Sequence, residues 1–406
     1  MWRQLKSGAW LNRERLARYP VILLVVSLAA AVIWVALSDG LIDRNGKPIG
    51  TDFSNVWAAG RLVLQGDPAA PYDVARQIAA EAYAFQGRST AFFGWHYPPV
   101  FLFVAAGLAL LPYGWALVLW TALTLPAYLA ALRAILSRRE TVLIALAFPA
   151  VFVNLGHGQN GFLTAALLGG ALAVLDYRPL LTGFLIGLLS YKPQFGLLVP
   201  VALLASGCWR AVTAATVTVL GTVVATLLTF GPRVWQAFAE FSSFTRLIVL
   251  EEGNIGWAKI QSLFSAVRML GGVVEEAYAA QVALALALAA SLVWLWRSSA
   301  SYDLKAAALA CGSLLATPYV LDYDFVVLAV SIAFFARHGL AHGFRDYEIS
   351  VLALCWIMPL FARSMAASLG APVGILSMLA LYAVTLRRAA TDIAAQVQTS
   401  TRLAPA

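Results

Sequence analysis

The chain has 406 residues, of which 61% are hydrophobic and only 12% are charged. Its mean hydropathy of +0.79 lies far above that of ordinary globular proteins, which indicates a polytopic membrane protein. The formal charge of +8 does not indicate nucleic-acid binding, because that function needs a basic face with exposed aromatic side chains on a soluble domain, and the sequence offers none. The excess of Lys and Arg is instead typical of cytoplasmic membrane loops.

The first long apolar run extends from Val21 to Leu37, which is long enough to cross a bilayer. It ends in Ala36-Leu37-Ser38, which loosely fits a signal-peptide cleavage site, but its length and the many spans after it favour a retained helix. Residues 1–19 carry five cations before this run. They are therefore expected in the cytoplasm, with the segment after the run on the outer side.

Residues 39–96 form a polar segment between apolar runs, and we predict that they are the first outer loop. This loop holds six of the 20 acidic residues of the chain: Asp39, Asp43, Asp52, Asp67, Asp73 and Glu81. Phe53 to Leu64 and Val74 to Phe85 are predicted to be short amphipathic helices that lie along the membrane face. Trp57, Tyr72 and Tyr83 would then sit at the membrane interface.

The rest of the sequence alternates between apolar segments and short turns. Helical segments are predicted at about 97–112, 114–136, 141–155, 160–176, 180–190, 194–207, 211–231, 278–297, 304–318, 323–337, 348–362 and 371–387. Basic turns should be cytoplasmic, whereas the non-basic turns and residues 232–277, the second outer loop, should lie on the outer side. This arrangement requires one re-entrant or very short segment between Tyr97 and Arg139, and it gives 11 to 13 spans. We therefore predict an all-α polytopic membrane fold, with a transmembrane domain over residues 20–389 and a polar cytoplasmic tail over 390–406.

Asp52 is the leading candidate for chemistry in the first outer loop. It stands in Gly50-Thr51-Asp52-Phe53-Ser54-Asn55, where Thr51 or Asp52 could simply cap the helix that follows and contribute about 1 kcal/mol. The alternative is a carboxylate at the membrane surface that takes a proton from an attacking hydroxyl. The sequence leaves both roles open.

Polar residues at other predicted outer turns complete the candidate set. His96 and Tyr97 precede two prolines that begin a helix, the turn NLGHGQNG contributes Gln159 and Asn160, and Lys192 is a lone cation where topology requires none. An interfacial histidine, a glycine-rich exposed turn and a lysine that reaches lipid headgroups are the alternatives to ligand binding. The sequence has no P-loop, Rossmann, GxSxG or zinc motif, so we expect no cofactor and no bound metal.

Four segments together resemble glycosyltransferase family 87. They are TDFSNVWAAGRLVLQGDPAAPYD, HYPPVFLFVAAGLALLPYGWALVLW, GQNGFLTAALLGGAL and YKPQFGLLVPVALL, and the similarity in order and spacing covers roughly residues 50–385. This family includes polyprenyl-phosphate-mannose-dependent mannosyltransferases of the GT-C superfamily. The resemblance implies a GT-C type multi-helix transmembrane fold whose long first extracytoplasmic loop carries an essential acidic residue, at the position of Asp52.

The resemblance also implies a chemistry. A lipid-phosphate sugar is reached from the extracytoplasmic side, and the carboxylate acts as general base on the acceptor hydroxyl with inversion at the anomeric carbon. Lys192 and His96 are then the candidates for stabilising the phosphate. As substrate-binding residues we select the polar side chains of these motifs: Asn55, His96, Tyr97, Gln159, Asn160, Lys192 and Gln194.

The expected partners are a polyprenyl-phosphate sugar donor, a glycan or glycolipid acceptor of the cell envelope, and membrane lipids, with the enzyme in the inner (plasma) membrane. Mannose is the best-known donor sugar of the family, but no residue here selects it over another hexose or a pentose. The main alternative is a secondary transporter or flippase, which would also have many spans and broken helices. Transporters usually show internal repeats and midplane charges, whereas the polar residues here gather at one face. A scaffold subunit would need no concentration of acidic residues in an outer loop.

Overall fold

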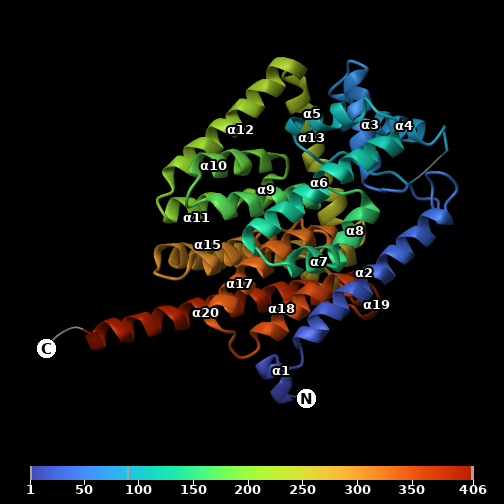
Figure 1. Ribbon diagram of the computed structural model, residues 1–406. Coiled ribbons are helices and arrows are strands. Elements are labelled where there is room, and N and C mark those ends of the chain that lie inside the picture. The colour runs from blue at the N-terminus through green and yellow to red at the C-terminus, as the bar shows by residue number, and fades with distance from the viewer. Residues whose placement is uncertain (1, 89–90, 404–406) are drawn as a thin grey trace.

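The computed structural model describes residues 2–88 and 91–403, and over these residues the chain is helical with only three isolated β-bridges (Figure 1). The first half contains α1 (Trp2–Ser7), α2 (Arg13–Ala36), α3 (Phe53–Leu64), α4 (Val74–Ala84), α5 (Leu102–Leu108), α6 (Tyr113–Ile135), α7 (Glu140–Leu146), α8 (Pro149–His157), α9 (Gly161–Val174), α10 (Pro179–Leu188) and α11 (Val199–Ala205). The second half contains α12 (Trp209–Phe230), α13 (Arg233–Thr245), α14 (Leu263–Met269), α15 (Val274–Arg297), α16 (Tyr302–Leu315), α17 (Leu328–His342), α18 (Glu348–Ile357), α19 (Ala362–Leu369) and α20 (Val373–Leu403). Short 3₁₀ turns connect several of them, at Ala70–Tyr72, Pro99–Phe101, Leu189–Tyr191, Pro193–Gly196, Trp257–Lys259, Asp322–Val327 and Met358–Leu360, and a π-helical turn covers Arg246–Glu251.

Six helices of the described residues are long and apolar enough to cross a membrane: α2, α6, α12, α15, α17 with its preceding turn, and α20. Two bent helix pairs, α7 with α8 at 51° and α18 with α19 at 69°, raise the number to eight if each pair is one span. The prediction of an all-α polytopic membrane protein is confirmed, but the prediction of 11 to 13 spans is too high by this criterion. Four of the predicted spans are helices of only 10–17 residues, at Pro99–Leu108, Gly161–Val174, Pro179–Tyr191 and Pro193–Ala205. The first of these, Pro99–Leu108, is the shortest and lies in the range 97–139 where the predicted topology required a re-entrant or very short segment.

Helix α16 forms the centre of the bundle and packs against α15, α17 and α20. All its residues from Ala306 to Leu315 are buried. A helix that is apolar on every side is stable in such a place, because protein covers all its faces. Helix α2 is the opposite case: it lies at the periphery, packs on α7 and exposes most of its apolar side chains, as expected for a helix that faces lipid (Figure 1).

The first outer loop contains the two predicted helices, α3 and α4, but α3 does not lie on a surface. Trp57 and Tyr72 are buried, and each donates a hydrogen bond to a backbone carbonyl of the protein, at Leu111 (2.9 Å) and at Tyr97 (2.9 Å). The prediction that these two residues sit at the membrane interface is therefore wrong, whereas Tyr83 is exposed. Gly60 allows α3 to pack closely against α5, because a Cβ at this position would lie 1.9 Å from the carbonyl oxygen of Ala105 on α5.

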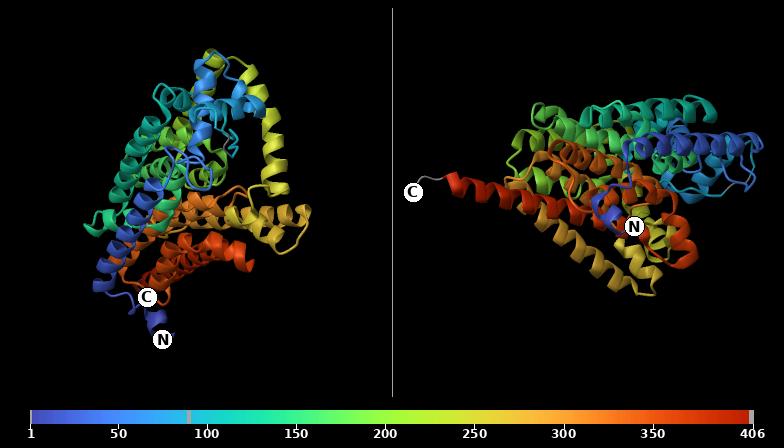
Figure 2. Two further views of the ribbon diagram at one scale, coloured as in Figure 1. Left: turned by 90° about the vertical axis from the view of Figure 1, so that its right-hand side faces the viewer. Right: turned by 60° about the horizontal axis from the view of Figure 1, so that its bottom comes forward.

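The second outer segment contains α13 and α14. At the opposite end of the molecule, α20 continues as a helix to Leu403, so the predicted tail is helical over its described part. Figure 1 and the left view of Figure 2 place the N-terminus and the end of α20 far from α3 and α4. The two outer-loop helices and the two termini therefore occupy opposite ends of the bundle.

Candidate active site

Asp52 occupies the N-cap position of α3 but does not cap it. Its side chain accepts no hydrogen bond from the first turn of the helix, although Asp73 does so for α4. The backbone of Asp52 is fixed because its N–H donates to the carbonyl of His157 (3.0 Å). Only 6% of the residue is exposed, so a carboxylate has been buried without the structural role that would account for it.

The carboxylate of Asp52 instead faces side chains from two distant parts of the chain, the turn between α8 and α9 and the turn that contains Lys259. Gln159 Nε2 donates a hydrogen bond to Oδ2 (3.1 Å), Lys259 Nζ lies 3.6 Å from the same oxygen, and His157 Nδ1 lies 3.7 Å from Oδ1. Thr51 Oγ1 donates to Oδ1 (3.3 Å) and lies 2.7 Å from His157 Nδ1. Both Thr51 contacts are satisfied when His157 carries a proton on Nδ1 and donates it to the hydroxyl.

The turn between α8 and α9 reaches Asp52 because of a glycine. Gly158 has φ +59°, and a Cβ there would lie 2.7 Å from the Cβ of Phe53 and 3.3 Å from the Cα of Gly50. Asn154 then closes the turn, since its Nδ2 donates to the carbonyl of Gln159 (3.0 Å) and its Oδ1 accepts from the N–H of Gly161 (2.9 Å). The sequence NLGHGQNG therefore places His157 and Gln159 beside the carboxylate.

Gln159 has a defined orientation. Its Oε1 accepts two hydrogen bonds, from the hydroxyl of Tyr97 (3.1 Å) and from the backbone N–H of Asn160 (2.9 Å). Its Nε2 must therefore be the group that points at Asp52. Tyr97, Gln159 and Asp52, all selected from the sequence, thus form one hydrogen-bonded chain.

The electrostatic surroundings keep Asp52 ionised. Burial by itself raises the pKa of this carboxyl, but the charge of Lys259, followed by His157 and the hydrogen bond from Gln159, outweighs burial and lowers the pKa below its usual range. The group is therefore a carboxylate at neutral pH. A carboxylate held in this way can accept a proton and cannot donate one.

Lys259 is a residue that sequence reasoning did not select. It stands at the end of the turn Trp257–Lys259, which is fastened beside the 317–324 turn by an isolated bridge between Ile260 and Leu321 and by a hydrogen bond from Gln261 N–H to the carbonyl of Val320 (2.8 Å). The reasoning that selected Lys192 could also have selected Lys259, because each is a cation in a predicted outer segment, where topology requires no positive charge. His157 was also left out, although it lies in the motif that supplied Gln159.

Lys192 is buried, and its ammonium group has a carboxylate partner. Its Nζ lies 2.7 Å from Oδ1 of Asp324, whose Oδ2 accepts from the N–H of Leu321 (3.0 Å). The Nζ atoms of Lys192 and Lys259 each lie 5.4 Å from the ring centre of Tyr323, and His157 packs edge-on against the same ring. The two lysines therefore share one neighbourhood beside Asp52.

The remaining selected residues are divided between two places. His96 and Gln194 line a pocket of about 110 Å³ together with Phe238, Phe241 and Thr245. Burial lowers the pKa of His96 to about 4, so its ring is neutral at pH 7, and its Nδ1 lies 2.9 Å from Thr245 Oγ1. Asn55 on α3 and Asn160 at the start of α9 are also buried, and no described protein group bonds to the side-chain oxygen of Asn55 or to either amide atom of Asn160. Such unpaired buried amides are costly unless a ligand or water completes them.

A second buried acid lies in the same loop. Glu81 on α4 accepts a hydrogen bond from the N–H of Phe93 (3.2 Å) through Oε2, whereas its Oε1 has no partner among the described residues. Burial raises its pKa to about 8. Unlike Asp52, this group is therefore a neutral acid through most of the physiological pH range.

The sequence matches the model of glycosyltransferase family 87 over residues 95–318. This match covers more than half of the chain. The chain belongs to glycosyltransferase family 87. It is therefore a membrane glycosyltransferase, and the GT-C type of fold agrees with its bundle of membrane helices. The matched region includes Tyr97, Gln159, Lys192 and Lys259, whereas Asp52 lies before it. No curated protein and no solved structure matched the chain.

Proposed function

We propose that this glycosyltransferase moves a hexosyl group from a polyprenyl-phosphate sugar to a glycan or glycolipid acceptor of the cell envelope, with mannosyl as the favoured sugar. Asp52 is the general base. The observation that supports this role is its buried carboxylate, which does not cap its helix and is oriented by Gln159 and charged partners. The transporter and flippase alternative has no comparable support, because the chain belongs to a family of glycosyltransferases.

The proposed reaction is a single displacement. The acceptor hydroxyl oxygen attacks the anomeric carbon of the donor and its proton passes to Asp52, while the bond from the anomeric carbon to the phosphate oxygen breaks. Polyprenyl phosphate leaves with the bonding electron pair, and the configuration at the anomeric carbon is inverted. Because the phosphate monoester is a stable anion, it needs neutralisation more than protonation.

Lys259 and Lys192 are the proposed partners of the donor phosphate. Lys259 is the better placed, because its pairing with Asp52 is loose at 3.6 Å, whereas Lys192 lies 2.7 Å from Asp324. When a phosphate draws Lys259 away, Asp52 loses the main charge that lowers its pKa and becomes a stronger base. The donor would in this way prepare the base for the acceptor.

The remaining polar side chains are proposed to bind sugar hydroxyls. The unpaired amide of Asn160 follows Gln159 directly and offers one donor group and one acceptor oxygen. Tyr97 and Asn55 would contribute to the same site, and the neutral ring of His96 with Gln194 would line its edge. We also propose that this site faces the extracytoplasmic side. Asp52 lies in the loop after the first span, and the basic residues before that span are predicted to be cytoplasmic.

The test is a transfer assay with the full-length protein in membranes. Radiolabelled polyprenyl-phosphate mannose, polyprenyl-phosphate glucose and a nucleotide-activated mannose are offered with envelope glycolipids as acceptors. We expect product only from a polyprenyl-phosphate sugar, and loss of that product in Asp52→Asn. Transfer from the nucleotide sugar alone would refute the proposed donor class, and full activity of Asp52→Asn would refute the proposed base.

A further inference from the structure

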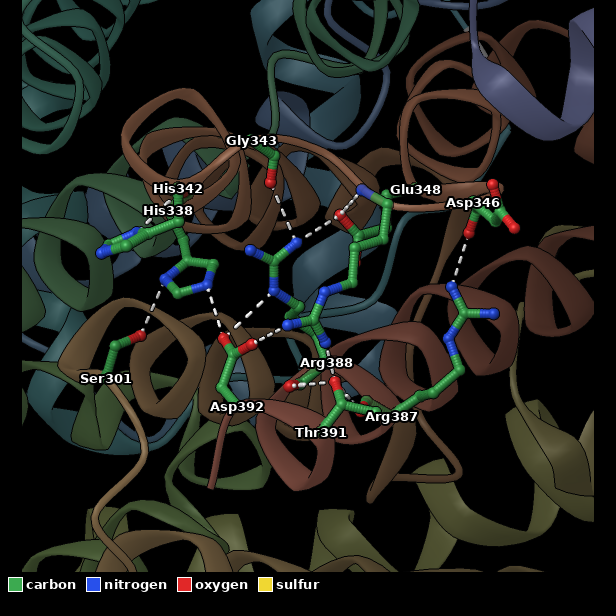
Figure 3. Close-up of polar contacts among 11 residues, drawn as sticks. Ser301, His338, His342, Gly343, Asp346, Glu348, Arg387, Arg388, Thr391 and Asp392 are labelled. Atoms are coloured by element: carbon green, nitrogen blue, oxygen red, sulfur yellow. Dashed lines mark hydrogen bonds and ion pairs between the residues drawn. The ribbon is translucent and has the colours of Figure 1, made fainter. Parts of the chain in front are cut away.

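A pocket of about 430 Å³ lies at the end of the molecule opposite α3 and α4. It is lined by Arg345, Asp346, Arg387, Arg388 and Thr391, and we refer to it as the arginine pocket. These residues come from the segment before α18 and from the middle of α20 (Figure 3). None of them takes part in the candidate active site.

The arginine pocket lies where apolar helices become polar. Helix α20 is apolar from Val373 to Leu386 except for a few small polar residues, and Arg387 and Arg388 follow directly. Helix α18 begins at Glu348 and continues with an apolar sequence. In a membrane protein this boundary lies at the level of the lipid headgroups, and the basic residues assign it to the cytoplasmic side.

The floor of the pocket is a fixed network. Arg388 is only 2% exposed, and its Nη1 donates to Glu348 Oε2 (2.9 Å) and to the carbonyl of Gly343 (3.0 Å), while its Nε donates to Asp392 Oδ2 (3.1 Å). The ring of His338 also contacts Asp392 Oδ2, at 3.0 Å (Figure 3). The charge of Arg388 is thus compensated, and its guanidinium is held in one orientation.

The rim of the pocket carries the unbalanced charge. Arg345 bonds to Thr391 and to Asp392, and Asp346 pairs with Lys6 of the N-terminal segment at 3.3 Å. The exposed Arg387 donates one hydrogen bond to the backbone carbonyl of Asp346 (2.6 Å) and has no carboxylate partner among the described residues. Counting the partners of each group, four cations (Arg345, Arg387, Arg388 and Lys6) face three carboxylates (Asp346, Glu348 and Asp392).

We propose that the arginine pocket binds the phosphate group of an anionic phospholipid of the adjacent leaflet. A guanidinium presents paired N–H donors that match phosphate oxygens. Arg387 uses one of its nitrogens for the carbonyl of Asp346 and has the other donors free within the described part of the chain, and Arg345 and Thr391 line the same pocket. The pocket volume exceeds that of a phosphate group, which leaves room for the glycerol part of the headgroup. A soluble phosphate compound offers the same chemistry, but the position at the apolar boundary favours a lipid.

The proposal is tested by native mass spectrometry of the full-length protein in micelles that contain equal amounts of phosphatidylglycerol and phosphatidylcholine. We expect wild-type protein to retain phosphatidylglycerol in preference to phosphatidylcholine. Arg387→Gln should retain it about tenfold less, because one charge-assisted contact is lost, and Arg387→Lys should recover part of the difference. Arg387 is exposed and makes a single bond to a carbonyl, so its replacement leaves the helix packing intact.

The matched control is Arg178→Gln, which removes the same charge from an exposed arginine at another basic turn. It should retain phosphatidylglycerol like the wild type, and all variants should transfer sugar at equal rates in phosphatidylcholine alone. Equal retention of phosphatidylglycerol by Arg387→Gln and wild type would overturn the proposal. Sodium phosphate is the second arm: if millimolar phosphate binds as tightly as phosphatidylglycerol, the ligand is a soluble phosphate and the lipid assignment is wrong.

Discussion

Replacing Asp52 by asparagine separates the chemistry of the site from its packing. Gln159 Nε2 points at this position because two N–H or O–H groups occupy its Oε1, so it can still donate to the amide oxygen of the introduced side chain. The folded state loses mainly the contact with Lys259, at a cost of about 1–3 kcal/mol. The reaction loses its general base, and the rate should fall by about 10²–10⁴-fold, equivalent to about 3–5 kcal/mol in the barrier.

The measurement is the initial rate of sugar transfer at saturating donor, with the melting temperature of the purified variant as a check of folding. Asp39→Asn is the matched control, because Asp39 belongs to the same loop but is highly exposed and pairs with Arg88 at the surface. Such a pair contributes about 0–1 kcal/mol, so this variant should keep the wild-type rate. A folded Asp52→Asn protein that transfers sugar within tenfold of the wild-type rate would refute the general-base assignment.

Three further replacements test the electrostatics and the packing of the outer loops. Lys259→Met should move the acidic limb of the kcat/KM profile to higher pH, because burial then raises the pKa of Asp52 without its main opposing charge; an unmoved limb between pH 4 and 8 would show that this pair does not act on the base. The pKa of Glu81, raised by burial to about 8, means that its contribution to stability is complete below its ordinary pKa near 4.5 and is lost as the pH rises through about 8. The melting temperature of Glu81→Gln should therefore equal that of the wild type at pH 5 and exceed it by several degrees at pH 9. Equal melting temperatures at pH 9 would contradict the assignment of Glu81 as a neutral acid. Gly60→Ala should lower the free energy of unfolding by about 1–3 kcal/mol through its clash with α5, measured by thermal or denaturant unfolding against Gly107→Ala, whose added methyl group meets open space. If both alanine variants are equally stable, the close approach of α3 and α5 is not required.

Local sequence patterns predicted several elements correctly because their signals are local. Helix α3 extends over Phe53–Leu64 as predicted from its apolar spacing and the breakers that follow, and α4 begins at Val74 after a capping Asp73. The same spacing could not tell a helix on a membrane surface from one inside the protein. Tryptophan is a residue type typical of membrane interfaces, but the indole of Trp57 is buried and donates a hydrogen bond to the segment before α6.

Local patterns likewise selected individual residues of the candidate site, but they could not show which of these residues meet. Tyr97, Gln159 and Asp52 were selected one by one from separate turns, and the structure joins them in one hydrogen-bonded chain. Lys259 was missed because a single lysine in a long loop has no local pattern that distinguishes it from a solvated one. Its position beside Asp52 follows from the bridge between Ile260 and Leu321, a contact between segments far apart in the sequence.

The sequence by itself determined that this is an all-α membrane protein and, through its motifs, the family of glycosyltransferases to which it belongs, since apolar length and motif order are properties of the chain alone. Only the tertiary structure decided which carboxylate is buried without a capping role and which cations surround it. The ionisation of Asp52 depends on Lys259, which lies far later in the chain, and that of Glu81 on the packing of α4. Burial and Coulomb interactions act through space, so the fold rather than the order of residues sets the charge of each group.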